Sequence, residues 1–107
     1  MASSIKYYRY NEPYQYFLGT TPVSGYHEIL VFKVPASIYG DMNALQKLKL
    51  EKESKFGRGI KYIVVNKDTG LFQTEGDLGL QNRAPDIIRD INPHSWEDWE
   101  LFYKQGA

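Results

Sequence analysis

The first third of the chain has the alternating polar and apolar pattern of β-strands. In residues 5–10, successive side chains fall on opposite faces of an extended segment, and tyrosines stand on both faces. The tripeptide Asn11-Glu12-Pro13 has the composition of a turn. Residues 14–18 then predict a short second strand.

Residues 27–34 form the clearest strand pattern of the first half. The apolar run from Ile29 to Phe32 predicts burial on both faces, which is typical of a central strand. Pro35 ends the pattern because proline cannot donate to a strand ladder.

A helix is predicted over residues 41–56. Asp41 has the side chain of an N-cap, which can accept from the free N–H groups of the first turn. Met42, Leu45 and Leu48 recur at three-residue spacing and give one apolar stripe. Gly57 is a natural left-handed ending for this helix.

The second half predicts a strand at 60–66 and a hairpin partner at 71–74. Residues 75–83 contain two glycines and little periodicity, so we expect a loop there. Long loops are often functional, and Leu78 and Leu80 could either hold this loop down or contact a partner.

Two short C-terminal helices complete the prediction. Pro85 suits the first position of one helix, which Pro93 ends. Ser95 and Asp98 resemble a capping box at the start of the other. Its apolar face would carry the residues Trp96, Trp99, Phe102 and Tyr103.

These elements predict one α+β domain over residues 1–107. We expect a small mixed or antiparallel sheet of about four or five strands, packed against the central helix at about 41–56 and the two short C-terminal helices. The connection from 27–34 to 60–66 would be right-handed if these strands are parallel neighbours.

The composition bears on location and partners. The chain has no cysteine, which excludes a disulfide scaffold and cysteine metal sites and favours a reducing compartment, hence the cytoplasm. The first residues lack the apolar run of a signal peptide, and no segment approaches the roughly 20 apolar residues that span a bilayer. We therefore expect no membrane association.

Catalytic chemistry has little support in the sequence. His27 could serve as a general base or ligand, but Glu28 beside it on a strand points to the other face. His94 and Asp98 are four residues apart, yet two ligands are too few for a structural zinc site. We expect no metal, no cofactor and no catalytic residue, and the edge or surface position is the more ordinary explanation of each histidine.

The first functional hypothesis is a small protein-binding module, such as an accessory, regulatory or inhibitor protein. Residues 41–61 carry six bases against three acids, whereas residues 62–107 carry four bases against eight acids, so charge is segregated along a chain of zero net charge. Such segregation can steer a partner, and aromatic anchors can give affinity. An exposed sheet edge could also pair with another copy. The candidate contact residues are Tyr8, Tyr10, Trp96, Trp99 and Tyr103. For the two tryptophans, a place in the core is an open alternative.

The second hypothesis is nucleic-acid binding through the basic stretch 47–61 and nearby tyrosines. Lysine and arginine would contact phosphates, and aromatic rings would stack on bases. The candidate residues are Lys47, Lys55, Arg58, Lys61 and Tyr62. The ordinary alternative is a solvated helix face, because Glu51 and Glu53 interrupt the bases.

Overall fold

The structure, a computed structural model, describes residues 5–102. Its elements are β1 (Lys6–Leu18), β2 (Thr21–Val34), α1 (Ala36–Tyr39), α2 (Met42–Phe56), β3 (Lys61–Asn66), β4 (Phe72–Glu75), α3 (Leu80–Asp90), the 3-10 turn η1 (Pro93–Ser95) and β5 (Glu97–Asp98). The backbone turns helical again at Glu100. Tyr103 lies outside the described residues.

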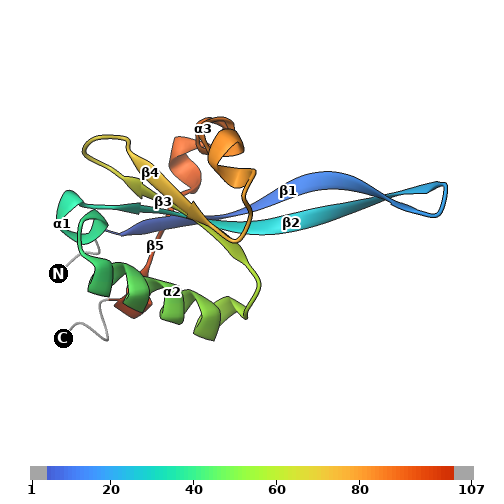
Figure 1. The fold of residues 1–107 in the computed structure, drawn as a ribbon. Coiled ribbons are helices and arrows are strands. Elements are labelled where there is room, and N and C mark those ends of the chain that lie inside the picture. The colour runs from blue at the N-terminus through green and yellow to red at the C-terminus, as the bar shows by residue number, and fades with distance from the viewer. Residues whose placement is uncertain (1–4, 103–107) are drawn as a thin grey trace.

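The five strands form one mixed sheet in the order β4-β3-β2-β1-β5. Strands β2 and β3 are parallel, and the other neighbouring pairs are antiparallel. Helix α2 lies on one side of the sheet and α3 on the other (Figure 1). The predicted α+β fold and its mixed sheet are therefore confirmed.

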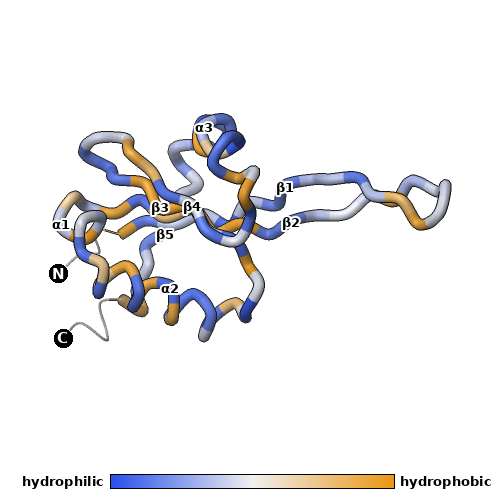
Figure 2. Tube along the Cα trace, in the orientation of Figure 1, coloured by the Kyte–Doolittle hydropathy of each residue, from blue (hydrophilic) through white to orange (hydrophobic). Residues whose placement is uncertain are grey.

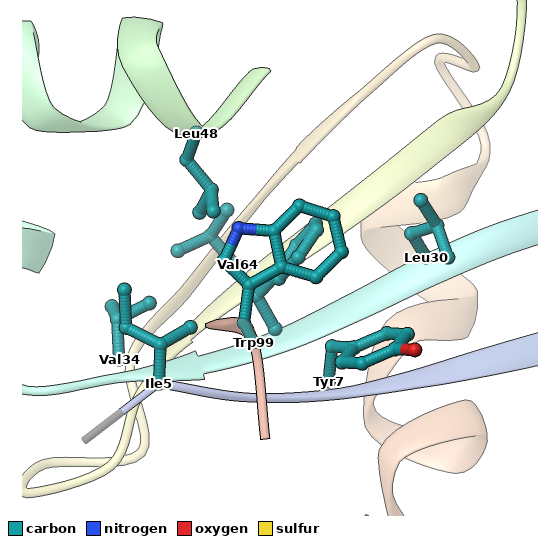
Figure 3. Close-up of a cluster of buried hydrophobic side chains, with 8 residues drawn as sticks. Ile5, Tyr7, Leu30, Val34, Leu48, Val64 and Trp99 are labelled. Carbon is teal, nitrogen blue, oxygen red and sulfur yellow. The ribbon is translucent and has the colours of Figure 1, made fainter. Parts of the chain in front are cut away.

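The core on the α2 side is built around Trp99, which is fully buried. The indole ring contacts Tyr7 edge-on at 5.0 Å and Phe32 at 5.2 Å between ring centroids. Its Nε1–H donates to Glu51 Oε1 at 3.1 Å. Figure 3 shows the ring at the centre of this cluster, below Leu48 of α2. The tryptophan thus joins the C-terminal segment to the helix and the sheet.

The core on the α3 side uses the alternate residues of the same strands. Ile29 and Val31 of β2 and Ile63 of β3 pack against α3, through residues that include Ala84 and Ile87. A strand buried on both faces reads as a continuous apolar run. This explains why residues 29–32 were predictable as a central strand.

Several local predictions are confirmed. Asp41 caps α2 by accepting from the backbone N–H groups of Asn43 and Ala44 at 3.0 and 3.2 Å. Gly57 ends α2 at φ +97°, in the region that favours glycine. The β2–α2–β3 crossing does join parallel neighbours.

The predicted turn at Asn11-Glu12-Pro13 is wrong, because β1 runs through it without interruption. Residues 6–18 pair with residues 33–21 in one antiparallel register, and Pro13 stands opposite Tyr26. A proline is tolerated in a strand where its missing N–H would point away from the ladder. The two short strands predicted at residues 5–10 and 14–18 are therefore one continuous strand, which forms a long hairpin with β2.

The predicted C-terminal helix from Ser95 is also wrong in its first residues. Residues 97 and 98 form β5, which pairs with Lys6 and Tyr7, and the Lys6 ammonium lies 2.7 Å from the Asp98 carboxylate. Pairing with the free edge of β1 outweighs the capping pattern here. Because this segment is extended, Trp96 and Trp99 reach opposite sides of the sheet and share no helix face.

The loop predicted at 75–83 is shorter than expected. Helix α3 begins at Leu80 and contains Pro85 in its interior, so Pro85 does not mark the helix start. Leu80 is fully buried, whereas Leu78 is fully exposed. Within residues 5–102, no helix has the length and apolar character needed to cross a membrane.

Candidate binding site: the β1–β2 arm

The outer part of the β1–β2 hairpin projects from the rest of the molecule (Figure 1). We call residues 12–27 the arm. The molecule measures 53 × 27 × 25 Å, and its radius of gyration is 14.8 Å. A compact domain of this length would have a radius of gyration of about 13 Å. The projecting hairpin accounts for the elongation.

The turn at the tip explains how the arm closes. Leu18 pairs with Thr21, so only Gly19 and Thr20 form the connection. Gly19 has φ +64°. A two-residue hairpin of type II′ needs a positive φ at its first central position, which glycine adopts without strain. The local sequence therefore fixes a tight turn at the end of a long ladder.

The arm presents two faces of different character. Directly paired residues point to the same side of a sheet. The Tyr14 face comprises Tyr14, Tyr16, Leu18, Thr21, Val23 and Gly25. The Phe17 face comprises Pro13, Gln15, Phe17, Pro22, Ser24 and Tyr26. The Tyr14 face continues the α3 side of the sheet, and the Phe17 face continues the α2 side.

The Tyr14 face is ordered by contacts between its own rings. Tyr14 stacks on His27 with ring centroids 4.0 Å apart and on Tyr16 at 5.5 Å. A Cβ atom built on Gly25 would lie 3.0 Å from the Tyr14 ring, so the glycine leaves room for that ring to lie across the strand. The stacking is partial, because Tyr14 and Tyr16 stay exposed and Leu18 on the same face is 65% exposed.

The Phe17 face leaves its large side chains uncovered. Phe17 is 63% exposed and Tyr26 is 73% exposed, high values among the aromatic residues within 5–102. Figure 2 shows an apolar segment near the tip of the arm, among pale and hydrophilic stretches. Between Pro13 and Tyr26 the sequence contains no charged residue. The tip is thus an uncharged aromatic surface in water.

Prolines protect the two edges of the arm. Pro13 stands opposite Tyr26, and Pro22 stands opposite Phe17, four positions further along the ladder. Hydrogen-bonded and non-hydrogen-bonded pairs alternate in an antiparallel ladder, so both prolines belong to the same class of pair. A proline fits only the class whose N–H would point outward. Each arm strand thus lacks one of its outward N–H donors, which makes pairing with a further strand less favourable.

A charged network fastens the arm to the body of the protein. Glu12 accepts two hydrogen bonds from the Arg83 guanidinium of α3, at 2.6 and 2.9 Å. Arg83 also donates to Asp77 at 3.0 Å, and Lys61 donates to the same carboxylate at 3.1 Å. The Arg83 hydrogen bonds hold the pKa of Glu12 and the pKa of Asp77 below their usual values. The charges at the arm base therefore neutralise one another.

His27 belongs to this arm base. Its Nδ1 lies 3.5 Å from Glu12 Oε1, across the directly paired position, and is buried. Its ring packs under Tyr14. Among residues 5–102 no group of three His, Asp or Glu side chains is placed to hold a metal ion. His94 is exposed in η1, where Asn92 caps its backbone N–H.

The predicted partner-binding residues are divided by the fold. Trp99 is buried in the core, so the core alternative is the correct one for it. Trp96 is half-buried beside Tyr8 at 6.4 Å, with the Lys33 ammonium 4.2 Å above its ring. Tyr10 is half-buried, and its hydroxyl lies 3.5 Å from Asp90. Tyr8, Tyr10 and Trp96 thus offer only partial ring surfaces.

The predicted nucleic-acid residues do not share one surface. Lys61 pairs in register with Ile29 on the α3 side, whereas Lys47 and Lys55 stand on α2. The Lys47 ammonium lies 5.0 Å from the Phe102 ring, and that of Lys55 lies 5.2 Å from the Trp99 ring. Tyr62 is half-buried below the Lys52 ammonium at 4.8 Å, and Arg58 is exposed in the α2–β3 turn.

The arm residues Tyr14, Tyr16, Phe17, Leu18 and Tyr26 were not among the predicted site residues. One signal in the sequence could have identified them, which is the run of charge-free residues from Pro13 to Tyr26. Such a run with five large apolar side chains is unusual for a surface segment. The turn predicted at residues 11–13 divided this region into two short strands, so the continuous charge-free segment was not predicted as one projecting element.

The protein thus has an α+β fold in which a mixed sheet is covered by helices on both sides. Two strands of this sheet extend beyond the helices as an aromatic arm. Comparison with known proteins adds no family to this description, since no family model, curated protein or solved structure matches the chain.

Proposed function

We propose that the protein is a small non-catalytic protein-binding module, an accessory, regulatory or inhibitor protein, and that the arm is its binding element. The observation that carries this proposal is the gathering of exposed aromatic and aliphatic side chains on a hairpin that has no charged residue between Pro13 and Tyr26 and that extends beyond α2 and α3. Tyrosine and other aromatic side chains give large contact areas at low entropic cost and are enriched at binding hot spots. A lack of cysteine supports a place in the cytoplasm.

The chemistry of the arm indicates what kind of partner it fits. Nucleic-acid binding depends on positive side chains at phosphates, and the arm has none between Pro13 and Tyr26. A protein surface with apolar contacts matches the arm better. Nucleic-acid binding through residues 47–61 stays a prediction, and a gel shift at low salt that weakens as salt rises would support it.

The test is capture of partners from the native host with three purified forms of the chain. The forms are the wild type, the arm variant Phe17→Ser/Tyr26→Ser, and the control variant Leu71→Ser/Leu78→Ser. Leu71 and Leu78 are exposed apolar residues outside the arm, so the control removes comparable surface. We expect the wild type and the control to retain a protein that the arm variant loses, and the purified partner to reproduce this difference. Equal retention by all three forms would reject the arm as the binding element.

A further inference from the structure

We propose that a protein partner encloses the arm in an apolar cleft, so that the Tyr14 face and the Phe17 face are both in contact when the partner is bound. The inference rests on the proposed function of the arm as a binding element. It deepens that function by stating the shape and the chemistry of the surface that the partner presents.

Both faces of the arm are open and carry exposed apolar side chains. Leu18 on the Tyr14 face is about as exposed as Phe17 on the opposite face. The helices α2 and α3 lie over the inner part of β1 and β2, and the arm extends beyond both of them (Figure 1). A partner on one face would leave the apolar side chains of the other face in water. A partner that contacts both faces removes more apolar area from water.

The size of the arm indicates the same arrangement. The six pairs from Pro13–Tyr26 to Leu18–Thr21 span about 20 Å, and a two-stranded ribbon is roughly 10 Å wide and 10 Å thick. One face therefore offers about 200 Å², far below the roughly 800 Å² that each partner contributes to a standard interface. Both faces together with the two edges offer about 800 Å². The arm thus reaches the standard size when a partner encloses it.

The form of the arm suits insertion into a cleft. The two-residue turn at Gly19 and Thr20 keeps the tip as narrow as the two strands behind it. Between Pro13 and Tyr26 there is no charged residue, so a cleft that closes around the arm takes no charge out of water. Projecting binding loops of other proteins reach concave surfaces in this way.

The side chains of the arm indicate how the cleft is lined. Pro13 and Pro22 each remove one outward backbone donor, so side chains and not an added strand make the contact. Tyrosine rings pack on apolar groups, whereas a buried tyrosine hydroxyl finds a hydrogen-bond partner. The cleft therefore has apolar walls, with polar groups at the levels of Tyr14, Tyr16 and Tyr26.

A second copy of this chain matches the arm poorly at two of its hollows. The hollow beside β4 is lined by residues that include Glu75 and Asp77, and the hollow beside β5 by residues that include Lys55 and Glu97. An uncharged arm in either hollow would take these charges out of water without adding a partner for them. A different protein with an apolar cleft fits the arm better.

A lipid interface also fits the arm less well. The polar turn at Gly19 and Thr20 would enter the interface first. Between Pro13 and Tyr26 the sequence has no lysine or arginine that could contact lipid phosphates. Interfacial binding draws on both apolar burial and such electrostatic attraction.

The main experiment measures the contribution of each face to the affinity of the partner. The probe is the purified protein that the wild type retains and Phe17→Ser/Tyr26→Ser loses in the capture experiment, and isothermal titration calorimetry measures its binding. We expect Tyr16→Ser/Leu18→Ser, on the Tyr14 face, to weaken binding at least about tenfold. The control variant of the capture experiment should bind like the wild type. Wild-type affinity in Tyr16→Ser/Leu18→Ser overturns the inference, because the partner then covers only the Phe17 face.

A second measurement keeps the large side chains of both faces and uses the absence of cysteine from the chain. Ser24→Cys places a thiol on the Phe17 face, Val23→Cys places one on the Tyr14 face, and Leu71→Cys places one at an exposed position outside the arm. Saturating partner should slow the alkylation of both arm thiols by a maleimide at least about tenfold and leave that of Leu71→Cys unchanged. Slowing at only one of the two arm positions overturns the inference.

The outcomes separate this inference from the proposed function. A partner that needs only one face rejects the enclosing cleft and leaves the binding role intact. Capture that ignores the arm rejects both. Arm-dependent cosedimentation of the wild type with phosphatidylcholine vesicles, without an arm-dependent protein partner, also rejects both and assigns the arm to lipid. Arm-dependent dimerisation in sedimentation velocity, without any other partner, rejects the cleft and assigns the arm to a second copy.

Discussion

Strands β1 and β2 keep one register over thirteen pairs, but their inner and outer halves have different surroundings. In the inner half, Ile29 to Phe32 are buried against α3 on one side and α2 on the other. In the outer half, the same ladder continues with both faces in solvent and large apolar side chains exposed. The inner segments of these strands therefore build the core, whereas the outer segments carry the arm that we propose as the binding element.

The largest expected effect concerns the inner half. Trp99→Ala removes the ring that joins the C-terminal segment to α2 and the sheet, and it leaves Glu51 without its donor. Truncation of a buried aromatic residue of this kind costs about 3–5 kcal/mol. Urea unfolding monitored by far-UV circular dichroism would measure the loss. The control Tyr26→Ala on the arm should cost less than about 0.5 kcal/mol, and equal losses would contradict the division between the halves.

A smaller effect is expected at the junction of the halves. Arg83→Ala removes both hydrogen bonds to Glu12 and the one to Asp77. Hydrogen bonds to charged groups contribute about 1.5–3 kcal/mol each when buried, and the partial exposure of Arg83 reduces this, so we expect a loss of about 1–2 kcal/mol. Hydrogen exchange of the arm amides should accelerate more than that of β3. Uniform acceleration in both strands would show that Arg83 serves the whole fold and not the arm base.

The same junction should respond to acid. Arg83 lowers the pKa of Glu12 in the folded state. The stabilisation is therefore complete above the ordinary carboxyl pKa and is lost as the pH falls through the lowered folded value. In Arg83→Ala this part of the acid dependence should disappear. Unfolding free energies measured between pH 3 and pH 7 for both proteins would test this, and parallel curves would contradict it.

A smaller effect on the unfolding free energy is expected at Glu51, and its pH dependence has the opposite sign to that of Glu12. Burial raises the pKa of this carboxyl, although the Trp99 indole opposes the rise, and Oε2 is buried without a hydrogen-bond partner. A raised folded pKa means that stability is greatest below the ordinary carboxyl pKa and declines as the pH rises through the raised value. Glu51→Gln keeps an acceptor for the indole and removes the buried charge.

We therefore expect Glu51→Gln to raise the unfolding free energy at pH 7 by up to about 1 kcal/mol, and to flatten its decline above pH 4. Glu53→Gln, two residues along the same helix and less buried, is the matched control. A destabilised Glu51→Gln protein at pH 7 would show that the carboxylate charge itself is needed in the core.

The smallest effect is expected within the arm. Gly25→Ala adds a methyl group 3.0 Å from the Tyr14 ring, at a backbone conformation that alanine tolerates. The reduced entropy of the unfolded chain offsets the lost contact, so stability should change by less than about 1 kcal/mol. The ring should move away from His27, and the His27 ring protons should shift in the NMR spectrum. Unchanged His27 ring shifts would contradict this expectation, because they would show that the Tyr14–His27 stack accommodates the added methyl group without a change of position.

The inner half of the molecule was the predictable part. The strands at 27–34 and 60–66, the helix at 41–56 and the Asp41 cap each have a local cause in their own residues, such as a continuous apolar run or a capping carboxylate. Local signals of this kind hold when tertiary packing agrees with them.

The arm and the C-terminal segment were not predictable, because distant residues decide them. Pro13 indicates a turn by itself, and only its pairing with Tyr26 places it in a strand. The capping pattern at Ser95 is outweighed by the β1 edge that receives Glu97 and Asp98. Trp99 could be assigned to the core only once that edge was known.

The separation of a stable body from a projecting arm is tested most directly by the unfolding free energy of a chain with a shortened arm. Replacing residues 13–26 by Asn-Gly joins Glu12 to His27, which are paired directly, through a two-residue turn. We expect the urea-extrapolated unfolding free energy to stay within about 1 kcal/mol of that of the intact chain. A loss of 3 kcal/mol or more, or a chain that does not fold, would contradict it by showing that the arm is part of what holds the body together.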